Sequence, residues 1–213
     1  MGSVVSVNLG HLRTDLLTAQ NNGRTGIDKR PVDGPIRLET PGVADDVIID
    51  RVHHGGEYQA VYAFNAEDLA YWSEQVGREL VPGNAGENVT IEGYDVNESV
   101  IGERWQLGTA IVRVTSPRIP CRTFSSFWEQ PRLVKLFTEV ARPGAFLAVE
   151  QPGLVQAGDR MRVLDTPEHG LTIAEHFRFA TGDRSLLDKM SAARSDLQPA
   201  GLERLDKVLA AIG

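Results

Sequence analysis

Residues 110–122 read AIVRVTSPRIPCR, and this segment contains the two features that the fold prediction starts from, a strand-forming run and a proline-rich loop. Its first part, residues 110–114, is a short run of strand-forming residues, whereas its second part is a loop that carries Pro117, Pro120 and Cys121. Proline has no amide hydrogen for a strand ladder, and it restricts the backbone of the residue before it. We therefore expect a short β-strand followed by a stiff loop that holds Cys121 in a fixed place.

Short runs of the same kind lie on both sides of this stretch, within residues 1–165, and are separated by glycine and proline. Many short strands with turn signals between them predict a β-barrel or a β-sandwich. Two helices interrupt the strands. One is capped by Asn65 and ended by Gly77, and the other begins near Pro131 and stops at residues 143–144. The further strands that we expect are residues 4–9, 47–49, 60–64 and 161–164.

Residues 166–213 differ in character and predict three amphipathic helices. Thr172 and Glu175 form a capping box, Asp183 can cap a second helix, and Pro199 can open a third. Because so small a unit has too little core to be stable alone, we expect it to pack on the barrel or on a second subunit, which leaves a homodimer open. The predicted fold is mostly β (α+β), with a β domain over residues 1–165 and a three-helix extension over residues 166–213.

The composition excludes several classes of protein. The 213-residue chain has a net charge of −7, which argues against nonspecific binding to the phosphate backbone of nucleic acids. One cysteine cannot form an internal disulfide, so the chain needs no oxidising compartment. No apolar run approaches the roughly 18 residues of a membrane span, and the N-terminus lacks the features of a signal peptide. We therefore expect a cytoplasmic protein without a membrane partner.

The charge is unevenly distributed. Residues 104–142 include seven basic residues and two acidic residues, so this segment, which contains the only cysteine, has a local charge of +5. Arg118 and Arg122 lie within three residues of Cys121 and would favour its thiolate form. A stiff loop that holds a cysteine between cations suits a soft-metal ligand or a nucleophile. The alternative is a lone buried cysteine that acts as a small hydrophobic residue.

Three other loops contain residues that could carry chemistry. The sequence HHGG at residues 53–56 could turn one histidine towards a pocket beside two glycines, or could be a strand that ends in a tight turn. The loop at residues 82–89, PGNAGENV, is rich in hydrogen-bonding groups but matches no phosphate-binding fingerprint, and an ordinary turn explains it too. The adjacent cations Lys29 and Arg30 could grip an anion or could lie on a solvated surface loop.

Taken together and in this order, these motifs resemble the MOSC domain, a family named for the C-terminal region of molybdenum cofactor sulfurase. The resemblance covers about residues 1–165, and the helical tail resembles the three-helix extension of the YiiM-like branch. One departure is Gly102-Glu103, where the family pattern has Gly-Asp, and it bears only on turn geometry. The matching stretches are residues 26–32 (GIDKRPV), 54–56 (HGG), 60–62 (AVY), 86–88 (GEN), 117–121 (PRIPC), 153–155 (GLV) and 158–159 (GD).

The resemblance implies a barrel-like fold with a cleft for a molybdenum cofactor of the molybdopterin type. Cys121 would ligate molybdenum through its thiolate and would be a catalytic residue together with His54. The basic residues would hold the phosphate of the cofactor, and the neutral or acidic ones would hydrogen-bond the pterin or orient the substrate. The cofactor-binding residues implied in this way are Lys29, Arg30, His54, Gly55, Glu87, Asn88, Arg118 and Arg122.

The resemblance also implies an activity, which is the reduction of N-hydroxylated compounds such as hydroxylamino base analogues. The cofactor would perform the redox step, and the protein would bind and orient the substrate. Because the sequence has no flavin or nicotinamide fingerprint, electrons would come from a flavin-dependent partner reductase, which the positive segment around Cys121 could guide. The alternatives are a carrier of cofactor or sulfur, with Cys121 as a persulfide, and a structural barrel with an inert thiol.

Overall fold

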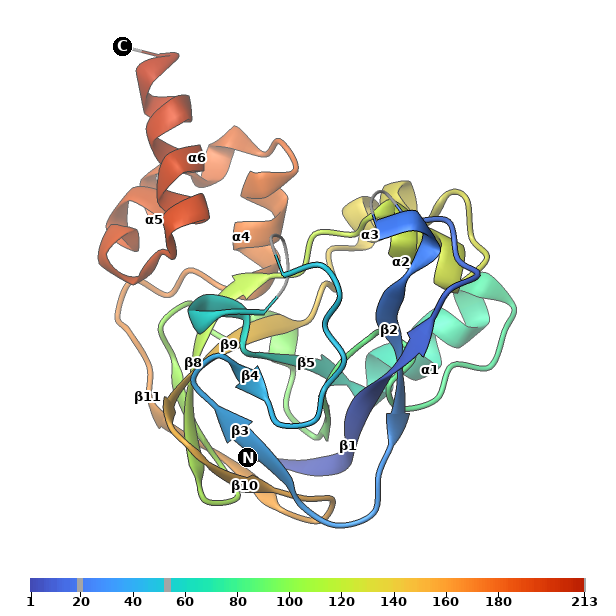
Figure 1. The fold of residues 1–213 in the computed structure, drawn as a ribbon. Coiled ribbons are helices and arrows are strands. Elements are labelled where there is room, and N and C mark those ends of the chain that lie inside the picture. The colour runs from blue at the N-terminus through green and yellow to red at the C-terminus, as the bar shows by residue number, and fades with distance from the viewer. Residues whose placement is uncertain (19–20, 52–54, 213) are drawn as a thin grey trace.

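The computed structural model describes residues 1–18, 21–51 and 55–212. Within these residues, seven strands form a closed barrel in the order β11-β7-β8-β9-β5-β6-β1, and pairing of β1 with β11 closes the ring (Figure 1). Only the β5–β6 pair in the ring is parallel, so the barrel is mixed. The strands are β1 (Gly2–Arg13), β5 (Val61–Asn65), β6 (Val89–Glu92), β7 (Arg104–Leu107), β8 (Ala110–Pro117), β9 (Ala145–Gln151) and β11 (Arg160–Asp165).

The predicted mostly β barrel is therefore confirmed, and irregularities in its strands show how it closes. The register of β1 shifts between Val4 and Ser6, and that of β8 shifts between Val114 and Ser116. Such bulges increase the local twist and bend a strand, which lets a sheet curve round on itself. Closure leaves these strands without unpaired edges, and their inward side chains form the apolar core.

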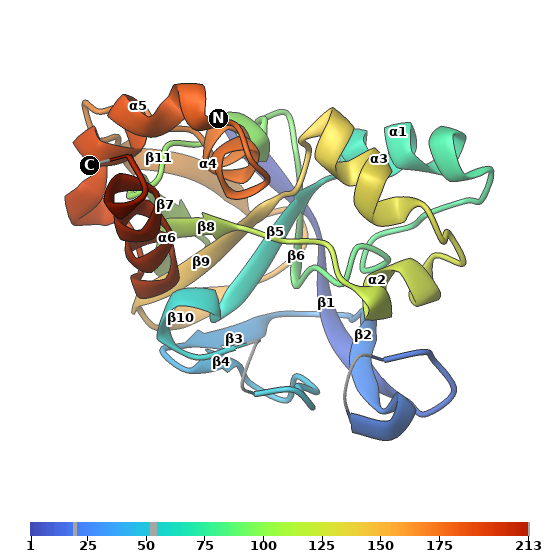
Figure 2. The same ribbon diagram turned by 90° about the horizontal axis from the view of Figure 1, so that it is seen from above.

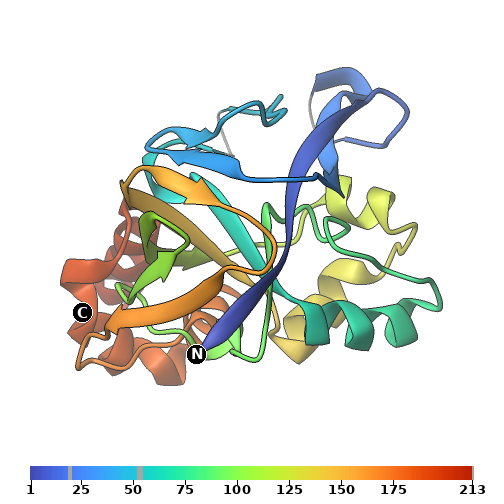
Figure 3. The ribbon, with the colours of Figure 1, turned by 90° about the horizontal axis from the view of Figure 1, so that it is seen from below.

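The remaining strands lie outside the ring. The second half of β1 leaves the barrel and pairs with β2 (Thr25–Pro31), so that the two form a projecting ribbon (Figure 3). A separate small sheet contains β3 (Ile36–Glu39), β4 (Gly42–Val43) and β10 (Gly153–Val155). The prediction of a strand at residues 47–49 was wrong. This segment has no ladder partner and runs past β2, close to Gly26, where a Cβ atom would lie 1.8 Å from the Val47 carbonyl oxygen.

Three helices cover one side of the barrel (Figure 2). Two of them were predicted, namely α1 (Ala66–Val76), which ends at the left-handed Gly77, and α3 (Leu133–Val140). The third, α2 (Arg122–Phe127), follows Cys121 directly and was not predicted. The three helices share an aromatic cluster in which the Trp72 and Phe137 rings stack at 4.5 Å. The short 3-10 helices of the chain are η1 (Asn21–Gly23), η2 (Glu57–Gln59), η3 (Val96–Glu98), η4 (Arg184–Leu186) and η5 (Arg194–Asp196).

The C-terminal residues form the predicted amphipathic helices on the opposite side of the barrel (Figure 2). The capping box is present, since the Thr172 hydroxyl accepts from the Glu175 amide and the Glu175 carboxylate accepts from the Thr172 amide. Asp183 caps η4 through the Ser185 amide, and Pro199 stands in the first turn of the last helix. None of the helices in the described residues is both long and apolar enough to cross a membrane. The three helices are α4 (Ile173–Ala180), α5 (Leu187–Ala192) and α6 (Pro199–Ala210).

This helical unit shares one hydrophobic core with the barrel. Its residues Phe179, Met190 and Leu205 belong to the same buried cluster as the barrel strands, and α4 packs against β8. Glu103 fastens the connecting segment, because its buried carboxylate accepts from Trp105 Nε1 at 2.6 Å and from Thr166 Oγ1 at 3.1 Å. The surface that the small unit requires is thus supplied by the barrel of the same chain.

The buried His176 makes this packing sensitive to acid. Burial, with a smaller contribution from Arg204, lowers the pKa of His176 from 6.5 to about 4. The unfolded chain therefore takes up a proton at higher pH than the folded chain, and stability is lost as the pH falls below about 6.5. We predict that His176 contributes a loss of about 2 kcal/mol between pH 7 and pH 5. Urea unfolding of the wild type and of His176→Gln at both pH values measures this. Identical pH dependence of the two proteins would contradict the prediction.

Candidate functional site

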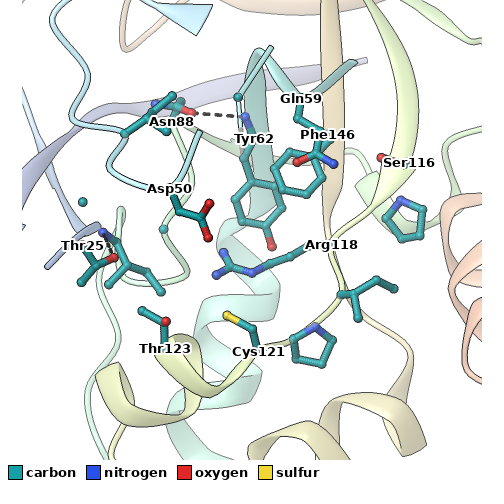
Figure 4. Close-up of a pocket in the computed structure, with 18 of the residues that line it drawn as sticks. Thr25, Asp50, Gln59, Tyr62, Asn88, Ser116, Arg118, Cys121, Thr123 and Phe146 are labelled. Carbon is teal, nitrogen blue, oxygen red and sulfur yellow. Dashed lines mark hydrogen bonds between the residues drawn. The ribbon is translucent and has the colours of Figure 1, made fainter. Parts of the chain in front are cut away.

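A cavity of about 520 Å³ opens between the barrel, the β2 ribbon and the C-terminal helices. This volume is typical of small-molecule and cofactor sites. Figure 4 shows that Cys121 and Thr123 come from the start of α2, Tyr62 from β5, and Ser116 from β8. The polar and charged residues that line it are Thr18, Arg24, Thr25, Lys29, Asp46, Asp50, Gln59, Tyr62, Asn88, Ser116, Arg118, Cys121, Thr123, His176, Gln198 and Arg204.

Cys121 lies in the wall of this cavity as the sequence predicts. β8 ends at Pro117, where the prolines begin, and the following loop leads to Cys121, which is the N-cap residue of α2. The cysteine is half-buried, carries a free thiol and lines the cavity, in the region that Thr123 also lines (Figure 4). The strand-to-helix connection therefore presents the thiol to the cavity from a fixed backbone.

Arg118 is the buried cation of the site. Only 6% of the residue is exposed, and its guanidinium carbon lies 4.1 Å from the Phe124 ring centroid and 5.1 Å from that of Tyr62. Its Nη1 donates to the Ala85 carbonyl at 2.5 Å. Its Nε is buried without a hydrogen-bond partner among the residues that the structure describes. The side chain thus places a positive charge in the cavity wall and keeps one N–H donor unused among the described residues.

Lys29 also lines the cavity, but its charge is balanced. It is buried and forms an ion pair with Asp46, whose Oδ2 accepts a second hydrogen bond from Asn88 Nδ2 at 2.9 Å. Asn88 Oδ1 accepts from the Tyr62 amide at 3.2 Å. Burial lowers the pKa of Lys29, and the charge of Asp46 opposes that shift. Lys29 and Asn88 therefore belong to one polar network in the wall, rather than being two independent anchors.

Glu87 lies behind this wall and does not line the cavity. Its carboxylate accepts from the Gly83 amide at 2.6 Å, the Ala85 amide at 3.0 Å and the Thr90 hydroxyl at 2.8 Å. Burial raises the pKa of this carboxyl group. The prediction that Glu87 contacts a cofactor is corrected by its position: it folds the loop that presents Asn88.

Arg30 and Arg122 were predicted to bind the cofactor, but neither lines the cavity. Successive side chains of a strand point to opposite faces, so Lys29 faces inwards, whereas the Arg30 side chain is 57% exposed and pairs with Asp28 at 2.8 Å. Arg122 is exposed at the first position of α2. The His54 prediction lies outside the described residues, while the neighbouring Gly55 lines the cavity with a φ of +78°.

The positive segment around Cys121 is dispersed in the fold. Arg104 and Arg113 pair with Glu150, at 2.7 Å and 3.3 Å, and Arg142 pairs with Asp68 at 3.0 Å. Of the seven basic residues of that segment, only Arg118 lines the cavity. Charge that is contiguous in sequence is therefore not contiguous in space.

Other cavity residues were missed by sequence reasoning. Arg24 and Arg204 supply cations from segments far from the cysteine, and Gln59, Ser116 and His176 supply polar groups. Ser116, Gln59 and His176 are each adjacent to a motif that the sequence analysis singled out, namely Pro117, residues 60–62 and the capping box. This adjacency does not by itself assign them to the cavity, because Gln59 and His176 reach it only through the packing of η2 and α4 on the barrel.

Comparison with known proteins gives consistent relatives. The family model of the MOSC domain matches residues 50–162. The uncharacterized protein YflK of Bacillus subtilis (strain 168) is 30% identical over 174 residues, which cover 80% of this chain and 77% of that protein. Protein YiiM of Escherichia coli (strain K12) is 26% identical over 163 residues, which cover 73% of each.

Solved structures show the same similarity over almost the full length. YiiM from Geobacillus stearothermophilus superposes with a TM-score of 0.80 at 26% identity, covering 97% of this chain and 98% of that one. YiiM from Escherichia coli gives a TM-score of 0.70 at 20% identity, covering 95% and 94%. The second similarity concerns the fold alone, whereas the first also has related sequence, and both include the C-terminal helices.

The role of Glu87 can be tested by changing one atom. In Glu87→Gln an amide N–H₂ must face a backbone N–H donor of the loop, so we predict a loss of unfolding free energy of about 1–3 kcal/mol. Glu92→Gln is the matched control, because Glu92 is exposed and its carboxylate accepts only from the Ser3 hydroxyl among the described residues. Urea denaturation of both variants gives the comparison. Equal small losses, within about 0.5 kcal/mol, would show that Glu87 does not organise the loop.

Proposed function

Because the chain belongs to the MOSC domain family, we propose that it binds a molybdenum cofactor in the cavity beside Cys121 and reduces N-hydroxylated small molecules there. The observation that carries the proposal is the position of the single thiol of the chain. It lines a cavity of cofactor size next to a buried arginine that has a donor to spare. The thiol shares the lining of this cavity with Arg118 and Arg24, and the loop that carries it leads directly into α2.

The residues of the cavity fit such a cofactor. Thiolate is a soft ligand that suits molybdenum better than carboxylate or water would, and Cys121 would provide it. Arg118 and Arg24 would hold the phosphate of the pterin, with the Arg118 Nε as a ready donor. Asn88 and the backbone beside Gly55 would contact the pterin itself. The Lys29–Asp46 pair is internally neutral, so it supports the wall without competing for the phosphate.

The proposed reaction consumes two electrons and two protons for each N-hydroxylated group. The N–O bond breaks, the nitrogen is left as an amine or amidine, and the oxygen leaves as water. The bound cofactor would supply the two-electron chemistry. The protein would orient the substrate and exclude bulk water, and the rings of Tyr62 and Phe146, 5.0 Å apart, give the cavity an apolar wall for this purpose.

The electrons would come from a separate flavin-dependent reductase, which forms part of this proposal. The sequence carries no flavin or nicotinamide fingerprint of its own. Because most cations of the segment 104–142 are paired within the chain, docking of that partner would depend on the rim of the cavity rather than on a broad positive surface. The exposed Arg204 at the rim is one such contact point.

Metal content is the first test of the proposal. We expect molybdenum close to one atom per chain in wild-type protein from a host that makes the cofactor, and at least a tenfold loss in Cys121→Ala. Arg122→Ala, next to the cysteine but outside the cavity, is the control and should retain the metal. Elemental analysis measures all three, and the reduction of N-hydroxybenzamidine with a flavin reductase is assayed on the same samples.

The outcomes of this test separate the possible roles of the chain. Equal metal in wild type and Cys121→Ala would remove the thiol from the coordination sphere. Bound molybdenum without turnover, or cofactor that leaves on dialysis, would favour a carrier of cofactor or of persulfide sulfur over a reductase. Metal that depends on Cys121, together with turnover, supports the proposal in full.

The contribution of Arg118 to cofactor binding can be tested with two matched variants. Charge-assisted hydrogen bonds to phosphate contribute about 1.5–3 kcal/mol, so Arg118→Gln should weaken cofactor retention by about tenfold or more. Arg122→Gln removes the same charge from an exposed position and should leave retention unchanged. Pterin released after dialysis is quantified by fluorescence, and thermal unfolding of both variants reports any general loss of structure. Similar retention in the two variants would contradict the role assigned to Arg118.

A further inference from the structure

Several residues that line the cavity have no role in the proposed binding of the cofactor. On the barrel side, Ser116 comes from the end of β8 and Gln59 from η2, and both lie away from Thr25 and Thr123 (Figure 4). On the other side, α4 packs against β8 and contributes His176, while α6 contributes Arg204. This part of the lining is thus built jointly by the barrel and the C-terminal helices.

Polar atoms in this part of the lining are buried without partners. Ser116 and His176 are each 3% exposed. The Ser116 hydroxyl, the His176 Nδ1 and the Gln59 Oε1 have no hydrogen-bond partner among the residues that the structure describes. Native proteins seldom leave buried polar atoms unsatisfied, because each costs about 1–3 kcal/mol. Three such atoms on residues that all line the cavity therefore point to a ligand that supplies the missing partners.

The chemistry of these atoms defines that ligand. Burial lowers the pKa of His176 to about 4, so its imidazole is neutral near pH 7 and has one donor and one acceptor nitrogen. The Gln59 Oε1 accepts, and the Ser116 hydroxyl both donates and accepts. None of the three groups carries a charge to balance an ion. The part of a ligand that contacts these three groups is therefore uncharged and has a hydrogen-bond donor and an acceptor close together, as an amide does.

The walls add a constraint on shape. Ser116 pairs with Phe146 in the β8–β9 ladder, and the Phe146 ring lies 5.0 Å from that of Tyr62. On the helical side, Gly201 has no side chain beside the imidazole, and a Cβ atom there would lie 3.4 Å from His176 Nε2. Aromatic rings on one side and a glycine on the other favour a flat ligand.

We propose that Gln59, Ser116 and His176 form a recognition subsite for the uncharged, amide-like end of a flat substrate, so that the C-terminal helices determine substrate specificity. This inference rests on the proposed function, because the other end of the same substrate would be the N-hydroxylated group that faces Cys121. Arg204 closes the helical side, since its Nη1 donates to the Ala180 carbonyl at 2.7 Å and ties α6 to the end of α4.

Two neutral compounds of the same shape test the subsite. Benzamide has an amide N–H₂ where acetophenone has a methyl group, so the two compounds share a flat shape and a carbonyl group, but only benzamide has N–H donors. Both are titrated against the full chain, as purified and after loading with cofactor, and binding is followed by ligand-observed NMR. We expect benzamide to bind at least tenfold more tightly than acetophenone, which corresponds to about 1.4 kcal/mol.

Variants of the cavity residues show whether these residues cause the preference for benzamide over acetophenone. Ser116→Ala and His176→Phe should each reduce the ratio of the two dissociation constants to below threefold. Ser99→Ala is the control, since its buried hydroxyl donates to the Val96 carbonyl away from the cavity, and it should keep the wild-type ratio. A ratio of two affinities cancels a general loss of binding from altered packing, and circular dichroism verifies that each variant is folded.

The subsite is overturned if the wild type binds both compounds equally, or if both cavity variants keep the full preference. Its failure is separable from failure of the proposed function, because binding of benzamide is measured without turnover. A cofactor-loaded protein that prefers benzamide but does not reduce N-hydroxybenzamidine would refute the reductase and keep the subsite. Reduction of N-hydroxybenzamidine by a protein that binds benzamide and acetophenone equally would support the reductase and refute the subsite.

Discussion

The site depends on one buried guanidinium. Arg118 lies between the rings of Phe124 and Tyr62 and donates to the Ala85 carbonyl, so it connects α2, β5 and the loop that presents Asn88. A buried charge is costly unless it is well paired, and here two aromatic faces and a carbonyl compensate it without using a carboxylate. Because Arg118 forms no ion pair with an acid among the residues that the structure describes, its positive charge is available to a ligand in the cavity.

The same segment explains how the barrel and the site are joined. β8 contributes Ser116 at its end and then, within five residues, Arg118 and Cys121. The prolines that end the strand also restrict the backbone of this short connection. The spacing of Ser116, Arg118 and Cys121 is therefore limited by the geometry of a short, stiff segment. The precision of the site therefore comes from a rigid element rather than from a flexible loop.

The sequence predicted those features that local rules determine. The strand at residues 110–114, the capping box of Thr172 and Glu175 and the barrel class followed from strand-forming residues, capping and turn chemistry, although β8 extends beyond residue 114 to Pro117. Arg30 is adjacent in sequence to Lys29, and Arg122 is adjacent to Cys121, but neither arginine lines the cavity that its neighbour lines. Strand alternation separates Lys29 from Arg30 once the strand is known. Ser116 and His176 lie 60 residues apart, and only the packing of α4 on β8 brings their elements together.

This division between local and long-range determinants bears on how the chain could change its substrate. Cys121 and Arg118 are held by the barrel and its aromatic cluster, whereas His176 and Arg204 belong to a small unit that needs the barrel in order to fold. A substitution on α4 or α6 that keeps the shared core would alter the part of the cavity that these helices line and leave the thiol in place. β8 connects the two regions of the cavity, because it carries Ser116 before its terminal proline and leads to Cys121 after it. The barrel therefore positions one region of the cavity and the C-terminal helices position another.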